Sequence, residues 1–151
     1  MRIQLEGQQC RQRQLRFAQF LANRDTDLAV ITDWRDVYYF TGVITEMPYP
    51  RAVLMEFGKN TTLVAEREFA EAAVDLQCAY PLQALATLNF QPNAALACIL
   101  EDVAPKGKRI AVQHESLLGA AARAIAGRNG ADLIPVDDDL LRIQAIKDGD
   151  E

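Results

Sequence analysis

The chain has 151 residues, half of them apolar, which is enough for one well-buried domain but not comfortably for two. It carries 21 acidic and 16 basic side chains, a net charge of -5, and this argues against a dedicated nucleic-acid binder that must neutralise phosphates. No stretch approaches the roughly twenty apolar residues of a membrane span, and the scattered Cys10, Cys78 and Cys98 are typical of reduced thiols in a soluble, cytoplasmic protein.

The N-terminal part of the chain predicts an amphipathic helix over residues 6–23. Its apolar stripe is built from Leu15, Ala18, Leu21 and Ala22, with Phe17 and Phe20 beside them. Three arginines fall outside this stripe, and we expect them on a solvated face: Arg11, Arg13 and Arg16.

Residues 28–32 predict a buried strand, because a short apolar run stops abruptly at a polar residue. A short helix should follow, with Asp33 capping its first turn and Gly42 ending it. The aromatic run 38–40 is compatible with core packing, a cofactor pocket or a partner surface, and packing is the favoured interpretation.

The middle of the chain predicts a hairpin, since apolar runs at 51–57 and 61–66 flank the Gly-containing turn 58–60. Residues 66–74 then show helical spacing, and 75–80 form a short extended segment.

The remaining elements alternate between helix and strand. Helices are predicted at 81–88, 92–102 and 117–128, strands at 108–113 and 131–136, and a closing helix follows. Because the hairpin requires at least one antiparallel pair, we expect an α/β layered domain with a mixed parallel and antiparallel sheet flanked by helices.

Few residues suggest catalysis. The single histidine, His114, and the nearby Ser116 follow a predicted strand, but neither has partners in the sequence that would complete a metal or nucleophile site. Three consecutive carboxylates at 137–139 could bind magnesium, yet Asp137 as an N-cap with two first-turn acids is the stronger interpretation. No dinucleotide or phosphate-binding glycine motif occurs, so the residues alone indicate a binding or scaffolding domain.

Four features occur in one order along the chain. They are the amphipathic helix, the strand leading into YYFTG (38–42), the segment PRAVLMEFGKNTTLVAE (50–66) and the closing LLRIQAIKDGDE (140–151). Together they resemble the N-terminal domain of the creatinase, prolidase and aminopeptidase P family of metallohydrolases. YYFTG is similar to that family's Tyr-aromatic-x-Gly turn, and IKDGDE to the Lys-x-x-x-Glu segment that leads into the catalytic domain.

The resemblance has two departures, at Gln144, where arginine is usual, and at Gln113, where glutamate is frequent. It implies a fold with a ribonuclease H-like motif, an N-terminal domain over residues 1–143, and over 144–151 the start of a linker to a catalytic domain absent from this chain. In this family the chemistry belongs to that second domain, where two divalent metals (Mn, Co or Zn) activate a bridging water. No cofactor is expected in this chain itself.

The function implied by the resemblance is that of a non-catalytic domain of a metal-dependent Xaa-Pro peptidase. Such a domain would contribute to a homo-oligomer, a dimer, contact its own catalytic domain, and wall the active site of a neighbouring subunit that takes proline-containing peptides. The loop 43–51 would project toward that site, with Tyr49 and Arg51 as the substrate-proximal residues. The alternatives are a creatinase-like C–N hydrolase and a peptide- or protein-binding pseudo-enzyme module.

Overall fold

The computed structural model describes residues 6–26, 28–44, 51–56, 58–79, 109–113 and 130–145. The helices in this part of the chain are α1 (Gly7–Ala22), α2 (Trp34–Thr41) and α6 (Asp137–Gln144). The strands are β1 (Leu28–Ile31), β2 (Ala52–Glu56), β3 (Thr61–Ala65), β4 (Leu76–Ala79), β5 (Arg109–Val112) and β6 (Asp132–Pro135).

The six strands form one sheet in the order β4-β3-β2-β1-β5-β6. Strand β2 pairs antiparallel with β1 and β3, whereas β1–β5, β5–β6 and β3–β4 are parallel pairs. The predicted mixed sheet and its hairpin are therefore confirmed. Because only β2 runs the opposite way, the carboxyl ends of five strands meet at one border of the sheet, together with the beginning of β2.

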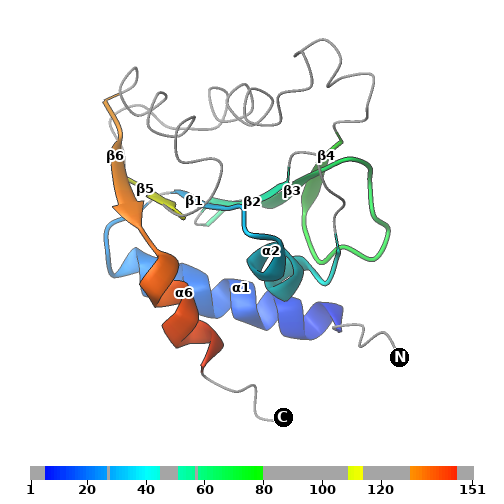
Figure 1. Cartoon of the computed structure of the whole chain (residues 1–151), viewed down its shortest axis with the longest axis horizontal. Helices are drawn as coiled ribbons and strands as arrows, with labels where there is room; N and C mark the ends of the chain where they lie inside the picture. The colour runs from blue at the N-terminus through cyan, green and yellow to red at the C-terminus, as the bar shows by residue number, and fades with distance from the viewer. Residues whose placement is uncertain are drawn as a thin grey trace.

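Helices α1, α2 and α6 lie on one face of this sheet (Figure 1). Between them and the strands lies the main apolar cluster, to which Phe17 of α1 and Phe40 of α2 contribute fully buried rings with centroids 5.2 Å apart. The ring of Tyr39 packs edge-on against that of Phe40, with the ring centroids 5.1 Å apart. Core packing is thus the correct interpretation for Tyr39 and Phe40 of the aromatic run.

Helix α2 begins and ends where its sequence predicts. The Asp33 carboxylate accepts a hydrogen bond from the Arg35 amide at 2.9 Å, which satisfies a free donor of the first turn. Gly42 has a φ of 75°, a left-handed conformation that glycine adopts without a Cβ clash, and its amide donates to the Tyr38 carbonyl.

Helix α1 is present, but the predicted orientation of its faces is partly wrong. Leu15 is 64% exposed and Ala22 is also exposed, whereas Arg13 and Gln14 are buried. Arg13 lies over the ring of Tyr39, 4.3 Å from its centroid, and donates to the Tyr39 carbonyl at 3.3 Å. The aromatic ring and the carbonyl stabilise a cation that the sequence suggested was solvated.

Two further predictions are wrong. Residues 66–74 form turns and bends instead of a helix. The Gln77 amide bonds both the N–H and the C=O of Phe69, and that carbonyl also accepts from the Ala72 amide at 3.2 Å in a tight turn. Helix α6 begins at Asp137, so its N-cap residue is Val136 and all three aspartates lie in the first turn.

The other predicted strands are confirmed by β1, β4, β5 and β6. The helices predicted at 81–88, 92–102 and 117–128 lie outside the described residues, as do Cys98, His114 and Ser116. Cys10 and Cys78 are both free thiols, as predicted. None of the described helices is long and apolar enough to cross a membrane.

Candidate functional site

A pocket of about 310 Å³ opens at the carboxyl border of the sheet, between the first turns of α2 and α6. Parallel sheets commonly place binding sites at this border. The lining combines polar and apolar side chains: Asp33, Arg35, Asp36, Gln113, Asp137, Leu140, Leu141 and Gln144.

Gln113 fixes the inner wall of this pocket. It is the residue directly after β5, it is buried, and its Oε1 accepts from the backbone amides of Thr32 (2.6 Å) and Asp33 (2.8 Å). Those two donors determine the orientation of the side-chain amide, so its Nε2 points at Asp36 and donates to Oδ2 at 2.5 Å. One glutamine thus ties the end of β5 to the end of β1 and to α2.

Asp36 is the centre of the network. Its second oxygen, Oδ1, accepts from Gln144 Nε2, which brings the last residue of α6 to the first turn of α2. Burial raises the pKa of Asp36 above its ordinary value of 3.8, because the charged form loses hydration. The amides of Gln144 and Gln113 oppose this shift by stabilising the carboxylate, while the charges of Asp33 and Asp137 add to it.

The chemistry available at this pocket is hydrogen bonding around a carboxylate that already has two amide partners. The described residues contain no group of three His, Cys, Asp or Glu side chains that could hold a metal ion. Asp36, Gln113 and Gln144, called the Asp36 network below, accordingly join β1, β5, α2 and α6 at the border of the sheet.

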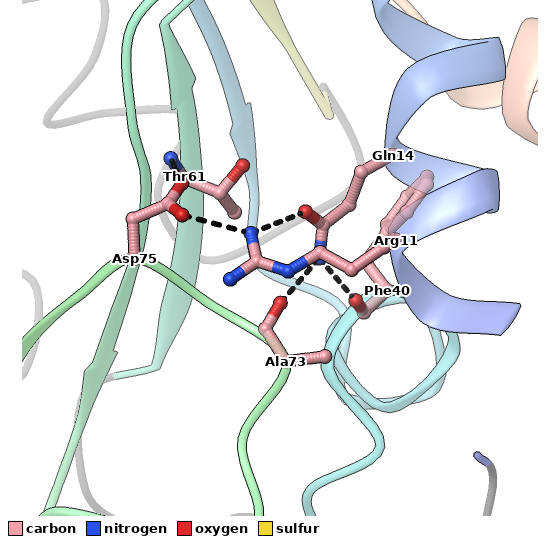
Figure 2. A network of polar contacts seen from close by, with 6 residues as sticks. All are labelled: Arg11, Gln14, Phe40, Thr61, Ala73 and Asp75. Carbon is pink, nitrogen blue, oxygen red and sulfur yellow. Dashed lines mark hydrogen bonds and ion pairs between the residues drawn. The ribbon is translucent and has the colours of Figure 1, made fainter. Parts of the chain in front are cut away.

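A second polar network attaches α1 to the rest of the domain. Figure 2 shows Gln14 and Arg11 extending from α1 toward β3, the loop before β4 and the end of α2. The buried Gln14 Nε2 donates to the carbonyls of Phe40 at 2.7 Å and Ala73 at 2.6 Å. Arg11 forms an ion pair with Asp75 at 3.1 Å and donates to Gln14 Oε1 at 3.3 Å.

Of the two residues predicted to lie near substrate, the structure describes one. Arg51 directly precedes β2 and is half-buried, and Tyr49 lies outside the described residues. Since Val53 of β2 pairs with Ile31 of β1 in antiparallel register, Arg51 stands at the same border of the sheet as Asp33 and the Asp36 network. It is not among the residues that line the pocket.

Asp36 was not among the residues predicted from the sequence, and no structural role was predicted for Gln113 or Gln144. A signal for Asp36 existed, since it lies three residues after an N-cap that directly follows a buried strand, which places it at the carboxyl border. The sequence also contained a signal for the burial of Gln14, because this residue stands at helical spacing between the buried Cys10, Phe17 and Leu21.

Comparison with known proteins identifies the fold. A model of the creatinase/prolidase N-terminal domain family matches residues 13–146. No protein with a curated description matches the sequence.

Several solved structures are similar in fold at low sequence identity. A proline dipeptidase from Streptococcus pneumoniae superposes with a TM-score of 0.66 at 16% identity, over 89% of this chain and 98% of that chain. A recombinant prolidase from Thermococcus sibiricus gives a TM-score of 0.71 at 16% identity, over 93% of this chain but 38% of that one. The dipeptidase PepE from Mycobacterium ulcerans gives 0.69 at 18% identity, over 98% of this chain and 40% of the other. The chain thus spans about two fifths of the length of the last two proteins.

Proposed function

The chain belongs to the creatinase/prolidase N-terminal domain family, and from this membership we propose that it is the non-catalytic N-terminal domain of a metal-dependent Xaa-Pro peptidase. The observation that carries the proposal is the family match over residues 13–146, nearly the whole chain. The similar folds include structures named as prolidases and dipeptidases, and the chain spans about two fifths of two of them. The catalytic domain, with two divalent metals, would accordingly lie outside this chain.

The role proposed for this domain is to assemble a homodimer and to wall the active site of the neighbouring subunit. Arg51 supports this role because it is partly accessible and stands at the border of the sheet where the loop 43–51 returns to β2. A guanidinium donates two parallel hydrogen bonds to a carboxylate, so it suits the free carboxyl end of a dipeptide. Tyr49, two residues earlier, would pack against the same substrate.

Replacing the guanidinium of Arg51 tests the substrate contact. In the full-length peptidase, Arg51→Ala is expected to raise KM for Xaa-Pro dipeptides roughly tenfold or more, because a hydrogen bond to a charged group contributes about 1.5–3 kcal/mol. For peptides whose carboxyl end is amidated, the same substitution should raise KM much less. Steady-state kinetics with both substrate forms measures the difference.

Arg142→Ala is the matched control, since Arg142 is an exposed arginine that belongs to α6 and not to the segment leading into β2. It should leave KM for both substrates as in the wild type. Equal kinetics for Arg51→Ala and the wild type would remove Arg51 from the substrate site.

A further inference from the structure

The two edge strands of the sheet, β4 and β6, differ in how they are protected against pairing with another strand. Strand β6 contains Asp132 and Pro135, and a proline has no N–H to donate while a charge opposes edge-to-edge association. Strand β4, with the sequence LQCA, contains neither a charge nor a proline. Among the strands that the structure describes, β4 is therefore the edge strand without these protective residues.

Strand β4 is also accessible. Leu76 is 51% exposed and Ala79 is exposed, while Gln77 and Cys78 are partly buried. A half-exposed leucine on an edge strand offers apolar surface area that a further strand would cover.

The position of β4 is fixed by polar contacts on its inner side. The amide of Asp75 donates to the Thr61 carbonyl at 2.8 Å, and the Asp75 carboxylate accepts from the Thr61 amide at 2.7 Å. Gln77 bonds the backbone of Phe69 in both directions, at 2.8 and 2.9 Å. A strand held in this way loses little further conformational freedom when a partner strand is added.

The charged residue that directly precedes β4 already has a partner. Asp75 precedes the strand and forms an ion pair with Arg11 at 3.1 Å, as Figure 2 shows. Asp75 therefore adds no uncompensated charge to a contact between two copies of this edge, although each chain carries a net charge of -5.

We propose that β4 pairs antiparallel with β4 of a second copy of this chain across a two-fold axis, which joins the two sheets into one. This inference rests on the homodimer of the proposed function and assigns its contact surface. A two-fold interface must be complementary to itself, and a strand without charge meets that condition.

The alternation of side chains restricts the register. Opposite residues of an antiparallel pair point to the same face of the sheet, so only residues separated by an even number of positions can face each other. With Gln77 on the two-fold axis, Leu76 lies opposite the partner's Cys78 on the face away from Gln77. This register covers the exposed leucine with a small apolar thiol.

Leu76→Lys tests the interface in the 151-residue chain. Sedimentation velocity over a range of concentrations should show the wild type passing from a 16.8 kDa monomer to a dimer. The dimer dissociation constant of the variant should be at least tenfold higher, because a lysine on an edge strand opposes pairing. Leu141→Lys is the matched control, since Leu141 is 67% exposed on α6, and it should dimerise like the wild type. Thermal unfolding of the variants establishes that each is folded.

Leu76→Cys tests the register without adding charge. Mild oxidation should give a covalent dimer on a non-reducing gel through the partner's Cys78, whereas Leu141→Cys should give none. A wild type that stays monomeric, or a dimer that Leu76→Lys leaves as strong as before, would overturn the proposal. The Arg51 kinetics are measured separately, on the full-length peptidase, so a change of KM there without a dimer formed through β4 would overturn this interface and leave the proposed peptidase function standing.

Discussion

Gln14 joins three segments of the domain through one amide group. It lies in the middle of α1, yet its partners are carbonyls of α2 and of the loop before β4, 26 and 59 residues further along the chain. The burial of Arg13 depends in the same way on Tyr39. Neither contact can be inferred from helical periodicity, because periodicity shows which side of a helix is apolar but not what the other segments offer to it.

Gln14→Leu should lower the free energy of unfolding by about 1 to 3 kcal/mol, because the substitution leaves buried carbonyls of Phe40 and Ala73 without their amide donor. The matched control is Gln12→Leu, the same substitution at an exposed position of α1. This control should change the free energy of unfolding by at most about 0.5 kcal/mol. Urea denaturation measures both. Equal effects of the two substitutions would show that the Gln14 amide is not needed to attach α1.

At the scale of elements, α2, α6, β1 and β5 meet at the Asp36 network. Strand and helix positions were largely predictable, because apolar runs, the Asp33 cap and the glycine turns are local signals. The network itself was not, since Gln113 and Gln144 lie 77 and 108 residues from Asp36 and meet it only after β5 and α6 are placed. The segment 66–74 was also mispredicted, and Gln77, which lies outside it, bonds its backbone at Phe69.

The raised pKa of Asp36 predicts a pH dependence of stability. The folded state binds a proton at Asp36 more readily than the unfolded state, so the contribution of Asp36 is most favourable below pH 3.8 and declines as the pH rises through the folded-state pKa. Asp36→Asn removes this titration. The unfolding free energy of the wild type minus that of Asp36→Asn should therefore fall as the pH rises above 3.8.

Gln144→Leu provides the matched comparison. The Gln144 amide lowers the pKa of Asp36, so its loss should raise that pKa further and extend the decline in stability to higher pH. Urea denaturation at a series of pH values measures all three proteins. Parallel curves for the wild type and Asp36→Asn would contradict the assignment of a raised pKa to this carboxyl group.

At the scale of the whole molecule, one mixed sheet carries helices α1, α2 and α6 on one face and gathers five strand ends at one border. The α/β class followed from the order of elements, and the family followed from four ordered features of the sequence. The strand order did not follow, because β1 pairs with β5 about eighty residues away. The site near substrate stays a prediction, carried by Arg51 at this border.

The central claim is that this domain serves a metal-dependent Xaa-Pro peptidase without performing its chemistry. Hydrolysis of an Xaa-Pro dipeptide, followed with and without added Mn²⁺ for the full-length protein and for the 151-residue chain, tests it most directly. The claim predicts metal-dependent release of proline by the full-length protein and none by the chain alone. Hydrolysis by the isolated chain, or an inactive full-length protein under all divalent metals, would contradict it.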